Sequence, residues 1–517
     1  MYKTQSFHQR NSRLLEVLGF IAILLIAALL RLYDLTNIPP GLHGDEAIQG
    51  LQARRFLADL HGGALDNFLS YNGDPFGYPL LLLPYFNVII FFLFGSSLFT
   101  LKLTSAIIGI STIALIYFST REMFNVRTAF FAAILATLSY YHIHFSRMAF
   151  PLVTTPLAVS AAILFLFKAL RTNKVWCFLG SGLALGAGVY SYPTYPVLFF
   201  APFIAFVAYK LVREPKVRAG CIALVIVAFF VAAPFFDMWL TGPIIQGRYH
   251  SASIYDDFAK LETPNEKAVF LTQRIILVPY IFFRSKGFDI VDALGIRPLF
   301  DPVTSVLVML GFLLCLFAIK DEKYCLVLIF VMMAFIGMFT HFTYGGAYRR
   351  TITGFVPMMF MGGIGLEYVC KKLSNAKVIR NFLIFSLLFF VAVYTTSFYF
   401  GEFPSRNEVR SVYAHPLVKA AEYLGTAEQD RIVYFYGGQW SWNYEANRFL
   451  SADMKGEDRS GSFGSNFSIE KKDSEVVYVF LPDYAYLLDE VKTKYPGGST
   501  TELKENDVLV FSSYVPP

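Results

Sequence analysis

Charged residues are scarce in this chain of 517 residues. They make up 16% of it, whereas about a quarter of the residues in ordinary globular domains are charged. Apolar residues account for 55% and aromatic residues for 17%, and the mean hydropathy is +0.50. A soluble protein could not bury so much apolar surface, so the composition excludes a cytosolic enzyme, a disordered chain and a secreted disulfide scaffold. The chain is predicted to be a polytopic membrane protein.

Cysteine pairs and nucleotide-binding motifs are also missing. The five cysteines lie in or beside apolar stretches without paired spacing, which is typical of small buried side chains and not of disulfides or metal ligands. The sequence shows no Walker loop, no dinucleotide-binding glycine pattern and no internal repeat. Cytoplasmic nucleotide chemistry and ATP-driven transport therefore have no support, and we expect no nucleic-acid partner.

The sequence contains instead a series of long apolar runs. A helix needs about 20 apolar residues to cross a bilayer, and about eleven stretches can form one. These are residues 17–32, 98–118, 129–145, 154–170, 177–190, 195–211, 219–236, 303–319, 325–340, 352–369 and 382–400. Basic residues precede the first run and no small-residue cleavage site follows it, which favours an uncleaved anchor over a signal peptide.

The positions of Lys and Arg predict which loops share a side of the membrane. If residues 79–94 do not cross, the basic loops all lie on the side of the basic N-terminus, as the positive-inside rule expects. These loops are at residues 121–127, 171–174, 210–218, 320–323 and 371–380. We therefore predict that residues 79–94, and likewise 275–283, form helices at the outer interface. The N-terminus is then cytoplasmic, and the chain is a multi-pass protein of the cell membrane.

Three outer segments follow from this topology: residues 33–95, 237–302 and the tail from 402. The tail holds 12 Lys and Arg against 18 Asp and Glu. Short β-rich runs at 431–436, 476–481 and 508–514 alternate there with helix-like stretches at 416–424 and 484–494, which predicts a small α/β domain. We expect two domains, a transmembrane module at 1–401, whose first outer loop (33–95) carries the catalytic residues, and an extracytoplasmic α/β domain at 402–517.

An acidic pair, Asp45 and Glu46, follows the first span almost directly and begins a stretch with helical spacing. One interpretation makes Asp45 the N-cap of this helix, with Glu46 in its first turn. The other makes the pair functional, activating an acceptor or holding a metal ion. A carboxylate beside the bilayer is partly desolvated, which raises its pKa and improves it as a general base.

Several short segments lie in an order that resembles a known superfamily. They are His43-Gly44-Asp45-Glu46-Ala47, Phe94-Gly95, His142-Ile143-His144-Phe145-Ser146-Arg147, Gly186 with Tyr190-Ser191-Tyr192, and Tyr348-Arg349-Arg350 ahead of Pro357. Together with the single first span, the long outer loop and the outer C-terminal domain, they resemble the GT-C glycosyltransferases over about three quarters of the chain. The nearest branch is the protein-mannosyltransferase-like one (glycosyltransferase family 39-like) of bacteria and archaea, which includes the aminoarabinose transferases of lipid A.

This resemblance implies a fold, an activity and a catalytic residue. The fold would be the GT-C bundle, and the activity would be transfer of a sugar from a polyprenyl-phosphate carrier to a glycan, lipid or protein acceptor on the outer face, with inversion at the anomeric carbon. The resemblance maps the catalytic acid onto Asp45, with Glu46 assisting or orienting it. Membrane lipids would surround the protein.

Basic residues on the outer side are informative because the positive-inside rule makes them scarce there. Arg349 and Arg350 lie in the predicted short outer loop 341–350, and arginine binds phosphate with a permanent charge and two parallel hydrogen bonds. The alternative is snorkelling toward lipid headgroups. Arg147 and Arg248 are further candidates for binding the donor phosphate, although a solvated loop is the alternative for Arg248.

Two histidines, His43 and His144, join the candidate donor-binding residues. His142 and His144 are two residues apart and would not share a helix face, which disfavours a metal site built from them. The sequence leaves a divalent cation open and predicts no other cofactor. Segment 74–79 lacks the acid–lysine–proline–proline sequence of the aminoarabinose transferases, so transfer of aminoarabinose to lipid A is not the default expectation.

Two aromatic clusters, at residues 190–195 and 439–444, have structural and functional interpretations. The first fits an aromatic belt or a stacking surface for sugar or isoprenoid, and the second fits a domain core or a carbohydrate-binding surface.

Two other functions also fit the sequence: a transporter or flippase of lipid-linked glycans, and a non-catalytic scaffold that binds envelope glycans. The candidate charges lie at the outer ends of spans and not at the bilayer midplane, which favours surface chemistry.

Overall fold

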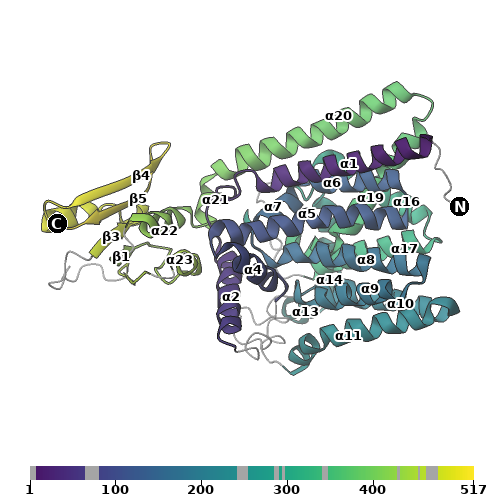
Figure 1. Cartoon of the computed structure of the whole chain (residues 1–517), viewed down its shortest axis with the longest axis horizontal. Helices are drawn as coiled ribbons and strands as arrows, with labels where there is room; N and C mark the ends of the chain where they lie inside the picture. The colour runs from purple at the N-terminus through teal and green to yellow at the C-terminus, as the bar shows by residue number, and fades with distance from the viewer. Residues whose placement is uncertain are drawn as a thin grey trace.

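A bundle of long helices and a small sheet domain at one end of it make up the computed structural model (Figure 1). The structure describes residues 7–63, 81–241, 254–283, 290–293, 297–340, 347–427, 431–451, 454–460 and 476–517. The N-terminus lies at the end of the bundle opposite the sheet domain (Figure 1).

Each of the predicted spans contains a helix. The bundle helices are α1 (Phe7–Leu32), α5 (Leu98–Met123), α6 (Val126–Leu138), α8 (Thr154–Thr172), α9 (Val175–Ala187), α10 (Ala201–Arg213), α11 (Arg218–Thr241), α16 (Pro302–Phe317), α17 (Glu322–Phe339), α19 (Phe355–Lys372) and α20 (Lys377–Thr396). Among the described residues, seven helical segments are long and apolar enough to cross a membrane, and four shorter ones are apolar. The chain is a multi-pass membrane protein with a mainly helical fold.

The predicted span 129–145 differs from the structure, because it is two helices. Helix α6 ends at Leu138, Ser139 is extended (φ −67°, ψ 111°), and α7 (Tyr140–Arg147) then begins. The apolar α6 gives way there to a polar stretch whose eight residues are all buried. Buried polar side chains need partners inside the protein, so α7 belongs to a packed polar layer and not to a lipid-facing span.

The described part of the stretch predicted not to cross the membrane lies at the end of the bundle that carries the sheet domain (Figure 1). It forms α4 (Leu82–Phe94), which follows α2 (Gly44–His61) in the described chain. Arg54 Nε of α2 donates to Ser96 Oγ just after α4, at 2.6 Å, and Lys102 Nζ in α5 donates to the Gly41 carbonyl at 3.0 Å. The chain therefore leaves and re-enters the bundle at the same end.

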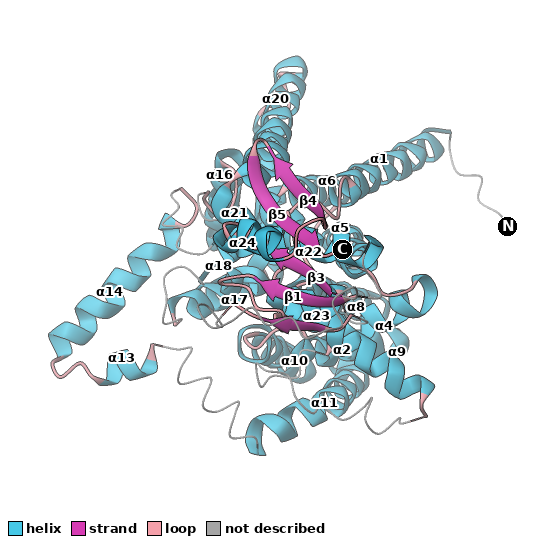
Figure 2. Cartoon of the chain, turned by 90° about the vertical axis from the view of Figure 1, so that its left-hand side faces the viewer, coloured by secondary structure: helices cyan, strands magenta, loops and turns pink. Residues whose placement is uncertain are grey.

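Ion pairs at the opposite end involve residues of the predicted basic loops. Arg121 contacts Glu16 at 3.1 Å, and Arg171 and Lys210 pair with Glu122 and Glu322. These basic loops share the end where the N-terminal helix begins, as the sequence predicts. At the other end, α14 (Pro264–Tyr280) lies across the direction of the bundle when the molecule is viewed from the sheet domain (Figure 2), which agrees with the interfacial helix predicted for part of it.

The C-terminal tail forms the predicted α/β domain. Its sheet has the order β2-β1-β3-β5-β4, with β1 parallel to β2 and β3, and β5 antiparallel to β3 and β4. The strands are β1 (Ile432–Tyr436), β2 (Gly456–Asp458), β3 (Val476–Phe480), β4 (Ser499–Glu505) and β5 (Val508–Val515), and the helices are α22 (His415–Ala427), α23 (Glu445–Leu450) and α24 (Leu487–Lys494). The sequence did not predict β2, β4 or α23, which are short or largely polar.

One hydrophobic core joins this domain to α2. Phe449 of α23 packs with Ala53 and Phe56 of α2 and with Phe91 of α4. A Cβ on Gly50 would lie 2.5 Å from the Phe449 ring, so the two helices approach closely where α2 has no side chain. Helix α21 (Asn407–Val412) connects α20 to the domain. The sheet domain is therefore fixed against the first outer helix.

Candidate active site

Helix α2 begins directly after His43, which is its N-cap. His43 Nδ1 accepts a hydrogen bond from the Asp45 amide at 3.1 Å, and Glu46 Oε1 accepts one from the His43 amide at 3.1 Å. These reciprocal bonds form a capping box. The interpretation of Asp45 as the N-cap is wrong, because the helix starts earlier and Asp45 lies in its first turn.

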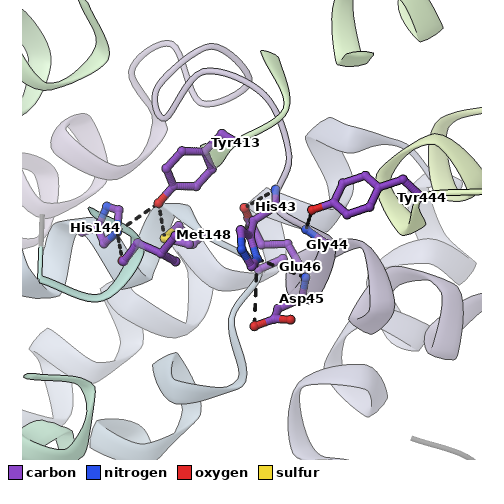
Figure 3. Close-up of polar contacts among 10 residues, drawn as sticks. His43, Gly44, Asp45, Glu46, His144, Met148, Tyr413 and Tyr444 are labelled. Carbon is purple, nitrogen blue, oxygen red and sulfur yellow. Dashed lines mark hydrogen bonds and ion pairs between the residues drawn. The ribbon is translucent and has the colours of Figure 1, made fainter. Parts of the chain in front are cut away.

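Glu46 is fully buried and turned into the protein (Figure 3). Besides the His43 amide, its carboxylate accepts a hydrogen bond from the Ala149 amide at 2.8 Å. Burial raises the pKa of Glu46, while the charge of Lys102 and these two amide bonds oppose the rise. Glu46 therefore fixes the start of α2 against the segment after α7, and it has no exposed surface with which to reach a substrate.

Asp45 differs from its neighbour, because its side chain is 26% exposed and points away from the Glu46 contacts (Figure 3). The basic nitrogen near its carboxylate is His43 Nδ1, at 3.9 Å, and this nitrogen already accepts the hydrogen bond of the Asp45 amide. The carboxylate stands in the first turn of α2, where unpaired amide groups and the helix dipole favour a negative charge. The adjacent acids are thus divided between one that holds the helix and one that is presented outward.

A tyrosine of the sheet domain also holds the first turn of α2 in place. The Gly44 amide donates to the Tyr444 hydroxyl at 2.9 Å (Figure 3). Burial raises the pKa of Tyr444 to about 12, so its hydroxyl keeps its proton at neutral pH. Tyr444 immediately precedes α23, which ties the position of Asp45 to the C-terminal domain.

Arg147 holds the link between α1 and α2. Its guanidinium is buried and donates to the carbonyl groups of Leu30 (3.0 Å), Tyr33 (2.6 Å), Asp34 (3.0 Å) and Ile38 (3.0 Å). All three nitrogens are used in these contacts. The structure therefore places the Arg147 guanidinium on the backbone of this link, where these bonds use four of its five N–H groups.

Lys102 of α5 binds the backbone of the next part of the segment that connects α1 to α2. It is buried, and its Nζ donates to the carbonyl groups of Thr36 (3.4 Å), Pro39 (3.1 Å) and Gly41 (3.0 Å). Gly41 has a φ of +94°, and a Cβ there would lie 2.1 Å from the Tyr413 carbonyl oxygen, so only glycine fits. Together Arg147 and Lys102 bind seven backbone carbonyls between residues 30 and 41.

The two histidines of α7 point to different partners. His142 Nδ1 lies 2.8 Å from Arg31 Nη2, and its ring stacks on Phe355. His144 lies 3.2 Å from the Tyr399 hydroxyl and 3.2 Å from the Tyr413 hydroxyl (Figure 3). They do not share a face, as their spacing predicts. His144 is fully buried in this network and belongs to the packing behind the site.

Arg349 and Arg350 form the end of α18 (Ala347–Arg350), and each covers an aromatic ring. The Arg349 guanidinium lies 5.6 Å from the centre of the Phe150 ring, whose centre is 6.0 Å from that of His43. Arg350 lies 5.5 Å from the centre of the Tyr192 ring, and its buried Nε has no hydrogen-bond partner among the described residues. One phenyl ring thus separates Arg349 from the residue that caps α2.

An apolar cavity of about 490 Å³ lies between helices of the bundle near these arginines. Its walls come from α14, α16, α17 and α19, and include Ile275, Val308, Phe335 and Met361. Gly337 of α17, two residues beyond Phe335, lies close to the Arg350 carbonyl, because a Cβ there would be 3.6 Å from that oxygen. The cavity therefore lies beside the arginine-bearing segment.

The structure thus places the His43 ring and the Arg349 guanidinium near Phe150, Asp45 beside His43, and Arg350 over Tyr192. It places Glu46, Arg147 and His144 in the supporting layer. Arg248 lies outside the described residues, as does segment 74–79. In the part of the chain that is described, no group of three His, Cys, Asp or Glu side chains could hold a metal ion.

Sequence reasoning missed several supporting residues, namely Lys102, Tyr413 and Tyr444. Lys102 is a lysine on the outer half of a span, which the same charge rule that singled out Arg349 could have found. The two tyrosines lie far along the chain in the C-terminal domain region, and no spacing pattern connects them to residues 41–46.

Comparison with known proteins shows where this arrangement occurs. Residues 78–236 match the family described as dolichyl-phosphate-mannose-protein mannosyltransferase. No curated protein matches the sequence significantly. The fold is similar to that of apo ArnT from Cupriavidus metallidurans, with a TM-score of 0.55, 15% identity, and 96% of this chain covering 97% of that one.

Two further solved structures resemble the chain and carry lipid phosphates. The structure of Cupriavidus metallidurans ArnT bound to undecaprenyl phosphate gives a TM-score of 0.53 at 14% identity, with 96% of this chain covering 97% of that one. The archaeal oligosaccharyltransferase AglB from Archaeoglobus fulgidus, in complex with an inhibitory peptide and a dolichol-phosphate, gives 0.52 at 14% identity, with 86% of this chain covering 64% of that one. At these identities the likeness establishes the fold.

Proposed function

The chain has the fold of the GT-C glycosyltransferase superfamily, and on this basis we propose that it is an inverting glycosyltransferase. Its donor is a sugar linked to a polyprenyl phosphate, and its acceptor is a glycan, lipid or protein at the outer face of the membrane. The undecaprenyl phosphate bound by ArnT and the dolichol-phosphate bound by AglB support the class of donor.

One observation carries the proposal: Asp45 is presented outward on a rigid helix start, beside His43, which one aromatic ring separates from Arg349. The His43 cap, the buried Glu46 and the Tyr444 hydroxyl fix the backbone on which Asp45 stands. A general base must be held in place to within hydrogen-bond reach of the proton that it takes. The supporting contacts supply that rigidity, and Arg349 supplies a cation for the leaving group.

The reaction that fits this geometry is a single displacement. The Asp45 carboxylate accepts the proton of an acceptor hydroxyl as that oxygen attacks the anomeric carbon. The bond between the anomeric carbon and the phosphate oxygen breaks, and the polyprenyl phosphate leaves with the electron pair. Arg349 and Arg350 stabilise the negative charge on the departing phosphate. Attack from the face opposite the phosphate inverts the anomeric centre.

The apolar cavity between α16, α17 and α19 supports a lipid-linked donor. Its walls are hydrocarbon and aromatic side chains, and it lies beside the segment that carries Arg350. An isoprenoid chain buried there would bring its phosphate to the arginines at the outer ends of the helices. A lipid-linked donor has an apolar chain to bury there, whereas a water-soluble nucleotide sugar has none.

Binding and turnover of the protein in lipid nanodiscs test the proposal separately. Native mass spectrometry should detect bound undecaprenyl phosphate, and Arg349→Ala should weaken its binding about tenfold, since a hydrogen bond to a charged group contributes about 1.5–3 kcal/mol. The matched control is Arg55→Ala, which removes an exposed arginine of α2 that pairs with Asp59 at 4.0 Å.

Turnover is measured as release of undecaprenyl phosphate from undecaprenyl-phosphate-linked mannose or glucose. Asp45→Asn should lower this rate by about 10²–10⁴-fold, the usual contribution of a general base, without changing the binding of undecaprenyl phosphate. Asp59→Asn, on the same helix, is the matched control. Full turnover by Asp45→Asn would refute the assignment of the base, and equal lipid binding by Arg349→Ala would refute the phosphate site.

A further inference from the structure

A second cavity, of about 310 Å³, lies in the sheet domain, outside the candidate active site. Its walls include the segments that follow the parallel strands β1 and β3, represented by Trp440 and Asp483. Helices α21 and α22 and the turn between β4 and β5 enclose it; Figure 2 shows these helices beside the sheet. In open α/β sheets, ligands bind outside the carboxyl ends of parallel strands, and this cavity is in that position.

The polar side chains at the cavity suit a ligand rich in hydroxyl groups. Gln439 and Asn407 offer amide groups that both donate and accept hydrogen bonds, and Asp483 offers an exposed carboxylate that accepts them. Gly438 has a φ of +65°, and a Cβ there would lie 2.7 Å from Asp483 Oδ2. The chain therefore turns tightly beside Asp483, and glycine keeps that carboxylate accessible.

Trp440 adds a flat apolar surface to these polar groups. Its ring is half-buried and packs on Tyr444, with the ring centres 4.7 Å apart and an angle of 49° between the planes. An indole held in this way can cover the C–H face of a pyranose ring while polar neighbours bind its hydroxyls. A cavity of this volume is at the lower end of the range for small-molecule sites, about 300–1,000 Å³, which fits one sugar unit.

Arg410 and His415 at the cavity both pair with Glu505, and Asp483 adds a carboxylate, so the cavity suits a neutral ligand better than an anionic one. Arg410 Nη1 lies 2.8 Å from Glu505 Oε2, and His415 Nε2 lies 3.1 Å from the same oxygen. Arg410 is therefore not available as a free cation for a phosphate. His415 is 6% exposed, and its Nδ1 has no hydrogen-bond partner among the described residues; a buried polar atom left in this way favours a ligand that satisfies it.

We propose that this cavity is a binding subsite for one sugar unit of a neutral acceptor glycan. The inference rests on the proposed transferase function and names its acceptor class. Two short connections join the cavity to the candidate active site. In the first, Trp440 packs on Tyr444, whose hydroxyl accepts a hydrogen bond from the Gly44 amide. In the second, the carbonyl of Tyr413, two residues before His415, accepts a hydrogen bond from the Leu42 amide at 2.8 Å. A glycan held here is in position to extend toward Asp45.

Ligand-observed saturation-transfer NMR on the full-length protein in nanodiscs tests the site. The probes are methyl α-mannopyranoside, methyl α-glucopyranoside and methyl N-acetyl-β-glucosaminide. At least one should bind the wild type, and Trp440→Ala should weaken that binding about tenfold, equivalent to about 1.4 kcal/mol. Asp483→Asn, an exposed substitution that leaves the domain core intact, should weaken it as well. Tyr486→Ala removes an exposed aromatic side chain of the same domain and should not change it.

The outcomes separate this site from the transferase function. Binding that persists in both Trp440→Ala and Asp483→Asn, or the absence of binding by all three glycosides to the wild type, overturns the sugar subsite. Asp45→Asn should bind the glycoside as the wild type does, because Asp45 does not line the cavity. Glycoside binding in a protein that releases no undecaprenyl phosphate would refute the transferase while the sugar site stands.

Discussion

Replacement of Glu46 by glutamine distinguishes a catalytic carboxylate from a positioning one. The Glu46 carboxylate accepts hydrogen bonds from two buried amides, those of His43 (3.1 Å) and Ala149 (2.8 Å). The glutamine side chain has the same shape, but it has one acceptor oxygen and a donor NH₂ group. One of the two amides would then face another donor and lose its partner.

The size of the effect follows from these contacts. An unpaired buried donor costs about 1–3 kcal/mol. The substitution also removes a negative charge that interacts electrostatically with the buried Lys102, which adds to this cost. We therefore expect Glu46→Gln to lower the midpoint of thermal unfolding clearly. Turnover should fall less than in Asp45→Asn, because the base itself is still present.

The assay combines thermal unfolding, followed by intrinsic fluorescence, with release of undecaprenyl phosphate from the lipid-linked sugar. The matched control is Glu422→Gln, which removes an exposed carboxylate paired with Lys419 and should leave both readings unchanged. If Glu46→Gln keeps the wild-type unfolding midpoint but loses turnover as completely as Asp45→Asn, then Glu46 takes part in the reaction and its positioning role is refuted.

Two further predictions concern the supporting contacts. Arg147→Met should lower the midpoint of thermal unfolding strongly, because four backbone carbonyls lose a charged donor and each such bond contributes about 1.5–3 kcal/mol. The control is Arg171→Met, which removes an arginine from an exposed ion pair. Equal unfolding midpoints for the two variants would contradict the positioning role of Arg147. Burial lowers the pKa of His415 below its ordinary 6.5, so the unfolded chain takes up the proton first and stability is lost as the pH falls from 6.5 toward the folded value. His415→Asn should flatten the dependence of the unfolding midpoint on pH in this window, and an unchanged slope would contradict it.

The positions of the apolar helices were predictable from the sequence because they depend on local composition. Each predicted span contains a helix, and α4, the described part of the stretch predicted not to cross, lies at the same end of the bundle as α2. The break at Ser139 was not predictable, since residues 129–145 are apolar enough on average to be one span. What ends α6 is a set of tertiary partners for polar side chains, which a hydropathy pattern does not contain.

The candidate site was found in the sequence only as a set of residue types. Asp45, Arg349 and His43 were named from their predicted place outside the membrane and from the resemblance to the GT-C superfamily, and the fold is similar to the folds of ArnT and AglB. Arg147 was named for the same reason, but its nitrogens bind carbonyls of the link that precedes α2. A sequence gives the sign of a charge on the outer side and not the direction in which its side chain points.

Apolar runs and the polar tail by themselves determined that this protein is a helical membrane protein with a C-terminal α/β domain. Helix formation and membrane insertion depend on local windows of sequence, so they can be inferred without any knowledge of distant contacts. Only the tertiary structure decided the different positions of the two adjacent acids. Glu46 is fully buried and Asp45 points outward because the start of α2 contacts Ala149 and Tyr444. Ala149 lies about 100 residues away in the chain and Tyr444 about 400. Burial by such distant partners leaves no pattern in the local sequence.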